Sequence, residues 1–160
     1  MKEQEFRLAL MAYLSPLKAM TTDALRTFVA LPMHADVHFV DFTLIAQQDF
    51  ADHLPIFVWA TTISNEVYTD VGLSTIPTDR FLWADIAGDE MENEEFVMKD
   101  TFARWFHSAW LDAGGNQYRT PAFLTLQHDI DTFCLRRGEW AECEVKYKPW
   151  NAQQKSAPNP

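Results

Sequence analysis

A broad apolar stripe at helical spacing is the feature that most constrains the fold of this chain. Its members recur three and four residues apart and stop before two glycines; they are Phe102, Trp105, Phe106, Ala109, Trp110 and Ala113. Such a stripe must be buried against another layer, and glycine commonly ends a helix. Asp89 is a candidate N-cap with Glu92 three residues later. The sequence therefore predicts one long helix over about residues 90–113.

Two further helices are predicted at the N-terminus. Phe6, Leu10 and Leu14 recur at helical spacing, which indicates an amphipathic helix. Ser15 followed by Pro16 is typical of a helix start, because serine caps the free N–H groups and proline is tolerated at the first helical position. The apolar spacing then continues to Phe28, so a second helix is expected after Ser15.

Alternating spacing replaces helical spacing in the middle and near the end of the chain. Strands are predicted at 37–45, 56–63, 67–71, 122–127 and 131–136, whereas residues 79–87 fit a short helix or a strand equally. Residues 141–147 alternate apolar and charged side chains, which predicts a half-buried strand. In that strand Cys143 and Val145 would face inward, and Glu144 and Lys146 would face solvent.

The C-terminal hairpin has a predicted register. If Phe133 shares a buried face with Ala141, a three-residue loop over 136–138 sets these two residues opposite one another, with Gly138 left-handed. Cys134 and Cys143 would then lie on opposite faces of the strand pair. Side chains on opposite faces cannot meet, so two free, buried thiols are expected.

The fold class predicted from these patterns is α+β. Two N-terminal helices, an antiparallel sheet with the long helix (about 90–113) packed on it and a C-terminal β-hairpin make a doubly wound parallel sheet improbable. The apolar fraction is 48% over 160 residues, which suits a single globular domain over 1–150. Residues 151–160 lack large apolar side chains and are predicted to be a disordered tail.

Negative charge is concentrated in one part of the chain. The formal net charge is −10, and residues 51–100 hold eleven Asp and Glu against only Arg80 and Lys99. Carboxylates in the first turn of a helix stabilise its macrodipole, which explains two or three of them without any function. The remaining excess predicts an acidic surface that attracts basic partners and repels nucleic acid and anionic membranes.

The first functional hypothesis follows from this charge. We expect a non-enzymatic, cytoplasmic protein that binds a basic protein partner, by analogy with inhibitors and immunity proteins; a DNA mimic is a related possibility. Nothing resembles a secretory signal, and no apolar stretch reaches membrane-spanning length. Trp140 lies outside the apolar alternation and could serve as an aromatic anchor. The candidate contact residues are Asp85, Asp89, Glu90, Glu92, Glu94, Glu95 and Trp140.

The alternative hypothesis is a small metal-dependent hydrolase or ligand-binding domain. His128, Asp129 and Asp131 form a compact cluster whose nitrogen and oxygen atoms could coordinate a divalent cation. Asp129 and Asp131 are also typical of a turn in which aspartate side chains accept hydrogen bonds from the backbone, and we favour that interpretation. No nucleophile motif or phosphate-binding glycine pattern occurs, so neither a catalytic residue nor a cofactor is predicted.

Overall fold

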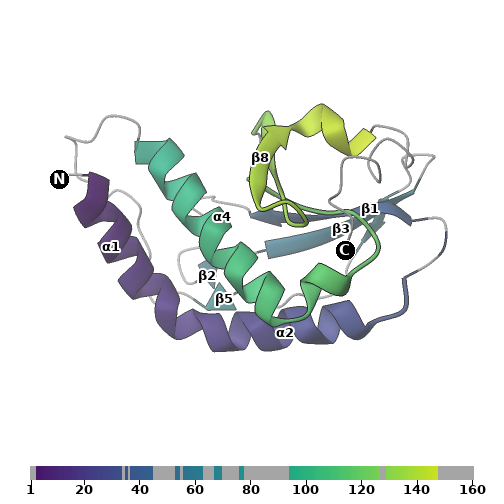
Figure 1. The fold of residues 1–160 in the computed structure, drawn as a ribbon, viewed down its shortest axis with the longest axis horizontal. Coiled ribbons are helices and arrows are strands. Elements are labelled where there is room, and N and C mark those ends of the chain that lie inside the picture. Colours follow the sequence, from purple (N-terminus) through teal and green to yellow (C-terminus); the bar gives the residue numbers. More distant parts are fainter. Residues whose placement is uncertain are drawn as a thin grey trace.

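A helical layer covers one face of a mixed sheet, and residues 143–147 lie on the other face (Figure 1). The computed structural model describes residues 3–33, 35, 37–44, 53–54, 56–62, 67–69, 76–77, 94–126 and 129–147. Within these residues the α+β class is confirmed. The predictions for 79–87 and for the tail over 151–160 lie outside the described residues.

The two predicted N-terminal helices are present. They are α1 (Glu3–Leu14) and α2 (Lys18–Ala30), joined by a single 3-10 turn, η1 (Ser15–Leu17). The predicted cap at Ser15 is wrong, because its hydroxyl donates back to the Met11 carbonyl at 2.6 Å. Leu14 keeps helical dihedrals, φ −75° and ψ −29°. The missing N–H of Pro16 therefore tightens the path into a 3-10 turn without ending the helical course.

The long helix is α4 (Glu94–Asp112), which confirms the predicted stripe; residues 90–93 lie outside the described part of the chain. α4 packs on both α1 and α2. Its ring side chains Phe106 and Trp110 contact Phe42 of the sheet, with centroids 5.4 and 5.6 Å away. Aromatic burial of this kind supplies much of the core's stabilisation. The helix is followed by left-handed Gly114 and the short turn η2 (Gly115–Gln117).

In the described part of the chain, six strands form the main sheet in the order β4-β3-β1-β6-β7-β8, and two short strands pair separately. Neighbours in the main sheet run antiparallel except β1 and β6, which run parallel. The sheet is thus mixed rather than wholly antiparallel, because the connection through α4 is long enough for a crossover. The strands are β1 (Val37–Leu44), β2 (His53–Leu54), β3 (Ile56–Thr62), β4 (Val67–Thr69), β5 (Ile76–Pro77), β6 (Ala122–Leu126), β7 (Asp131–Cys134) and β8 (Glu139–Glu142).

The C-terminal hairpin is present, but its predicted register is wrong. Phe133 lies opposite Trp140 rather than Ala141, across a four-residue turn that ends at left-handed Gly138. Both rings belong to the core on the helical side of the sheet, with centroids 5.4 Å apart. Burying an indole removes far more apolar area from water than burying an alanine methyl group, and this difference favours the observed register.

The predicted strand over 141–147 is also wrong beyond residue 142. β8 ends there, and the chain continues as a 3-10 helix, η3 (Cys143–Tyr147). With three residues per turn, Cys143 and Lys146 share a side, and Lys146 is buried instead of facing solvent. Cys134 and Cys143 are free thiols as expected, although only Cys134 is buried and the register argument for their separation no longer applies.

Candidate functional site

The predicted acidic contact residues fall largely outside the described part of the chain. Asp85, Asp89, Glu90 and Glu92 are among the residues that are not described, and Glu94 and Glu95 are described only as backbone in the first turn of α4. Their role in binding a partner stays a prediction. Asp100 is the last of the eleven Asp and Glu in residues 51–100, and its side chain is described. It is buried and does not lie on the predicted acidic surface.

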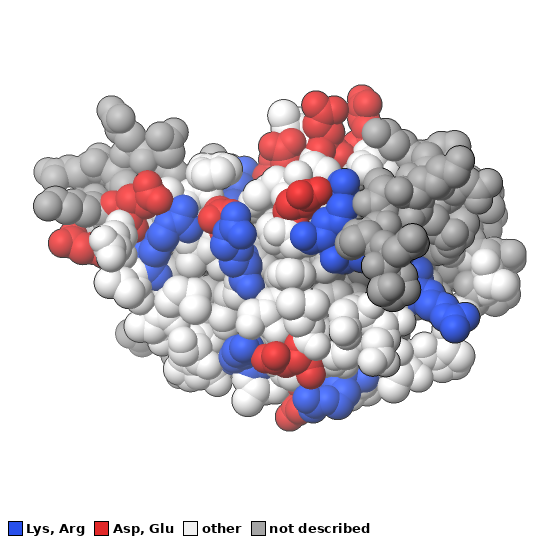
Figure 2. Space-filling view, in the orientation of Figure 1, with Lys and Arg blue, Asp and Glu red and all other residues white. Residues whose placement is uncertain are grey.

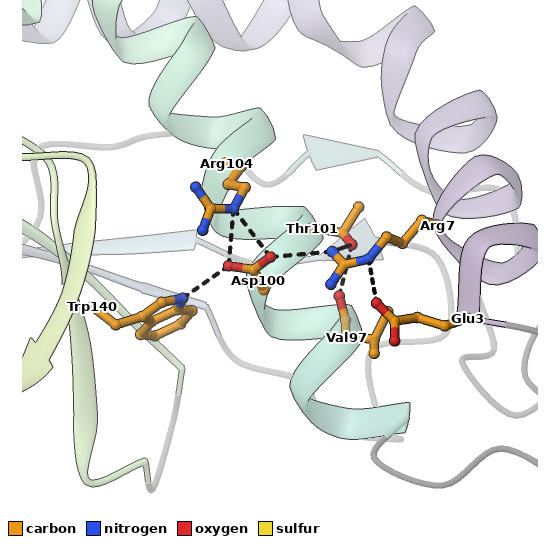
Figure 3. Close-up of polar contacts among 7 residues, drawn as sticks. All are labelled: Glu3, Arg7, Val97, Asp100, Thr101, Arg104 and Trp140. Atoms are coloured by element: carbon orange, nitrogen blue, oxygen red, sulfur yellow. Dashed lines mark hydrogen bonds and ion pairs between the residues drawn. The ribbon is translucent and has the colours of Figure 1, made fainter.

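Asp100 is buried at the centre of a polar cluster that joins α1, α4 and β8 (Figure 3). It is 7% exposed. Its carboxylate accepts hydrogen bonds from Arg7 Nη1 at 3.1 Å, Arg104 Nε at 3.0 Å and Trp140 Nε1 at 3.1 Å. Arg7 also bridges to Glu3 at 2.9 Å. The negative charge of Asp100 is therefore paired with donors inside the fold and does not contribute to an acidic surface.

These hydrogen bonds decide the pKa of Asp100. Desolvation by burial raises the pKa of the carboxyl, but the hydrogen bonds from Arg104, Trp140 and Arg7 oppose it and together prevail, so the pKa lies below its ordinary value. Donors directed at the charged form of a carboxyl favour ionisation. Asp100 is thus a stable anionic acceptor for three donors from three elements.

Trp140 is already engaged on the helical side of the sheet. It is half-buried, its ring packs edge-on against Phe133, and its indole N–H is taken up by Asp100. A buried indole usually needs such an acceptor. The anchoring role predicted for Trp140 is untested, and only the remaining exposed part of its ring would be available to a partner.

Exposed carboxylates gather at the edge of the sheet formed by β7, β8 and η3, where Figure 2 shows acidic side chains at the top of the view. We call Asp131, Glu142 and Glu144 the acidic edge. Asp131 and Glu142 are directly opposite one another on neighbouring strands. Nearby Glu139 pairs with Arg137 at 3.1 Å, but no described cation forms an ion pair with the acidic edge. Opposed like charges destabilise a strand pair.

One large apolar side chain lies beside the acidic edge. Ile130 immediately precedes Asp131 and is 80% exposed, more than the other exposed large hydrophobic residues of the described chain. Its backbone carbonyl accepts a hydrogen bond from the Cys143 amide at 2.9 Å, which places it against the start of η3. An exposed apolar group bordered by carboxylates is suited to contact a partner that is both apolar and basic.

Asp129 takes part in the turn that sequence analysis favoured. One carboxylate oxygen pairs with Lys99 of α4 at 2.8 Å, and the other accepts a hydrogen bond from the Asp131 amide at 3.4 Å. Among the described residues no group of three His, Cys, Asp or Glu could hold a metal ion. His128 lies outside the described residues, so the metal role of His128, Asp129 and Asp131 is untested.

A second ion pair, between buried Lys146 and partly buried Asp41, was not predicted from the sequence. Lys146 of η3 donates to the Asp41 carboxylate on β1 and to the Thr125 hydroxyl on β6, the latter at 2.5 Å. The Lys146 side chain is 5% exposed and that of Asp41 is 14% exposed. This pair holds η3 to the outer face of the sheet, beside a small apolar cluster of Phe39, Phe123, Cys134 and Val145.

The pKa of Asp41 moves in the opposite direction from that of Asp100. Burial raises the pKa of the Asp41 carboxyl more than Lys146 and Thr125 lower it, so the group ionises less readily than an exposed aspartate. One sequence signal for this site existed. Phe39 and Phe123 occupy the same strand face as Asp41 and Thr125, and two aromatic rings on that face indicate that it is covered.

No protein-family model matches this chain, and neither curated proteins nor solved structures show significant similarity to it. No helix within the described ranges has the length and apolar character needed to cross a membrane.

Proposed function

We propose that this chain is a non-enzymatic, cytoplasmic binding protein that engages a basic protein partner, in the manner of an inhibitor or immunity protein. The observation that carries the proposal is the acidic edge. Asp131 and Glu142 are exposed and directly opposed, with Glu144 close by in sequence and no described cation between them. Lysine or arginine side chains of a partner would relieve this repulsion and would steer association from a distance.

The acidic edge lies close to α4, the helix that begins within the acid-rich part of the sequence. Lys99 lies one helical turn after Glu95 in α4, and its ammonium group pairs with Asp129 at 2.8 Å. Asp129 is two residues before Asp131. The beginning of α4 therefore lies beside the turn that leads into the acidic edge. This proximity supports the proposal that the start of α4 borders the same contact surface as the acidic edge.

The proposed anchor of the contact is Ile130. Charge alone gives fast association but limited retention, whereas a buried apolar anchor slows dissociation. With Ile130 80% exposed beside three carboxylates, the complementary partner surface is an apolar depression bordered by lysine or arginine. A basic active site of an enzyme or toxin has this character, and covering it would inhibit the partner.

The test begins with capture of the partner at low salt and its purification, starting with the products of adjacent genes. The affinity of the purified pair is then measured by calorimetry for the native chain and for the triple variant Asp131→Asn, Glu142→Gln, Glu144→Gln. The matched control removes three exposed carboxylates from the helical layer, in the variant Glu5→Gln, Asp23→Asn, Asp112→Asn. Both triple variants change the net charge by the same amount.

We expect the acidic-edge variant to weaken binding at least tenfold and to reduce its salt dependence, while the control changes affinity less than threefold. Ile130→Ser should raise the dissociation rate with little change in the association rate. Equal losses in the two triple variants would mean that only net charge matters. Unchanged affinity in the acidic-edge variant would refute the proposed surface.

A further inference from the structure

Three oxygen-bearing side chains converge on the outer face of the sheet beneath η3. Asp41 comes from β1, Thr125 from β6 and Thr132 from β7, three neighbouring strands. The Thr125 hydroxyl donates to Asp41 Oδ1 at 2.8 Å. Thr125 and Thr132 are directly opposite in register, and their hydroxyl oxygens are 2.8 Å apart. These groups belong to the sheet and orient one another.

The hydroxyl proton of Thr125 can be assigned by counting donors. It goes to Asp41, so the Thr125 oxygen acts toward its other neighbours as an acceptor. The Thr132 hydroxyl lies 2.8 Å from that oxygen and also donates to the Leu124 carbonyl at 3.2 Å. A lone pair of the Thr125 oxygen and Oδ2 of Asp41 are then two acceptors close enough to bind the same donor atom. Both require a donor, and one of them is anionic. A cation with several N–H groups meets both requirements.

In this structure that place is occupied by the ammonium group of Lys146, which donates to both oxygens. Lys146 is not part of the sheet. It comes from η3, a five-residue 3-10 helix after the last strand. The acceptors therefore belong to a rigid element and the cation to a separate short segment, as in a binding site and its ligand.

We propose that Asp41, Thr125 and Thr132 form a preformed binding site for a primary alkylammonium ion, which the chain fills with its own Lys146. The site is built for a compact ammonium rather than a guanidinium, because its acceptors are one carboxylate oxygen and one hydroxyl instead of a carboxylate pair in a fork. The ligand class includes the side chain of a lysine from another protein. This inference is independent of the acidic edge.

The test restores the cation from solution. Lys146→Ala removes three methylene groups and the ammonium, which together correspond to propylammonium. We expect the melting temperature of this variant to rise with propylammonium chloride along a saturating curve, half-maximal on the order of millimolar for so small a ligand. The native protein, whose site is filled, should show no such rise.

Two controls separate binding from ionic strength. Tetramethylammonium carries the same charge without N–H donors, and the double variant Lys146→Ala, Asp41→Asn lacks the anionic acceptor. Neither should give the saturating rise. Equal effects of propylammonium and tetramethylammonium, or an undiminished response in the double variant, would overturn the proposal. If Lys146→Ala is unfolded in plain buffer, circular dichroism should show it folding as propylammonium is added, and persistent unfolding would count against the site.

A second variant tests selectivity for charge. Lys146→Gln keeps N–H donors on a side chain one bond shorter but removes the positive charge, so Asp41 loses its cation. We expect a clear fall in melting temperature at pH 7 that is partly reversed at pH 5, where Asp41 can bind a proton. A melting temperature equal to that of the native protein at both pH values would show that the site does not require a cation.

Discussion

Asp100, which is buried, and Asp41, whose side chain is 14% exposed, hold this fold together in different ways. Asp100 accepts hydrogen bonds from Arg7, Arg104 and Trp140, and both arginines remain partly exposed, with side-chain exposures of 31% and 62%. Among the described residues Asp41 pairs with one cation, Lys146, whose side chain is 5% exposed. The pKa of Asp100 lies below its ordinary value and that of Asp41 lies above it.

The contrast teaches that the number and exposure of donors decide what a buried carboxylate contributes. Around Asp100 the cations keep contact with water, so little desolvation is added by pairing. Around Asp41 both charges leave water, and the cost of desolvation offsets most of the attraction. The Asp100 cluster is expected to tolerate loss of one partner. The Asp41 pair is not, because either charge left alone would be buried without compensation.

The largest expected effect is that of Lys146→Met. The variant leaves Asp41 without a cation, and breaking a buried pair in this way should lower the free energy of unfolding by about 3–5 kcal/mol. Urea denaturation monitored by tryptophan fluorescence measures it. The matched control is the double variant Asp41→Leu, Lys146→Met, which should recover most of the loss because both charges are gone. A single variant as stable as the double would contradict the contrast.

A smaller effect is expected from Asp100→Asn. The amide still accepts one hydrogen bond, and Arg7 and Arg104 can turn toward water, so the loss should be about 1–3 kcal/mol. Glu3→Gln is the control, since it removes an exposed partner of the same Arg7 and should change stability by at most about 1 kcal/mol. A loss for Asp100→Asn as large as that for Lys146→Met would show that the two sites respond alike to the loss of an ionic partner.

The pH dependence of stability should differ in sign between the two sites. For Asp100 the folded pKa lies below the unfolded value of 3.8, so its contribution is present above pH 3.8 and is lost as the pH falls through the folded pKa. For Asp41 the folded pKa lies above 3.8, so its contribution improves as the pH falls toward 3.8.

Asp100→Asn should therefore reduce the loss of stability below pH 3.8, whereas a variant at Asp41 should alter the curve above it. Urea unfolding at closely spaced pH values from 2.5 to 6 provides the measurement. If the native and Asp100→Asn curves ran parallel below pH 3.8, the assigned direction of the Asp100 pKa shift would be wrong.

The smallest effect is expected at the acidic edge. Neutralising the carboxylates of Asp131, Glu142 and Glu144 in the triple variant should leave the free energy of unfolding unchanged or raise it by about 0.5 kcal/mol, because opposed like charges repel. Thermal and urea unfolding of the isolated triple variant test this. A loss above about 1 kcal/mol would indicate that these carboxylates stabilise the fold through unrecognised contacts.

The helices could be predicted because their apolar periodicity is strong and local. Phe6, Leu10 and Leu14 are all fully buried, as their spacing predicts. The prediction of a strand over 141–147 failed because the alternation of these residues fits two structures. One is a strand with Lys146 in solvent, and the other is a strand that ends early. The sequence cannot distinguish these, since the partner of Lys146 is 105 residues away.

The same limitation applies to the candidate site. Asp100 belongs to an acidic run and was counted with its neighbours, but its partner Arg7 precedes it by 93 residues. Burial and ion pairing between distant segments are decided by tertiary packing, for which local composition carries little information. The turn at Asp129 was predictable, because an aspartate side chain that accepts a nearby backbone N–H acts within a few residues.

The parallel pairing of β1 with β6 determines when the fold can be completed. β1 can pair with β3 soon after both are synthesised, but Thr125 follows Asp41 by 84 residues. Closing so long a segment is entropically costly and slows folding. Until α4 and β6 have emerged, one edge of β1 has no strand partner of its own. During that interval the nascent chain exposes an apolar strand edge to other chains, and its vulnerability to aggregation should be greatest then.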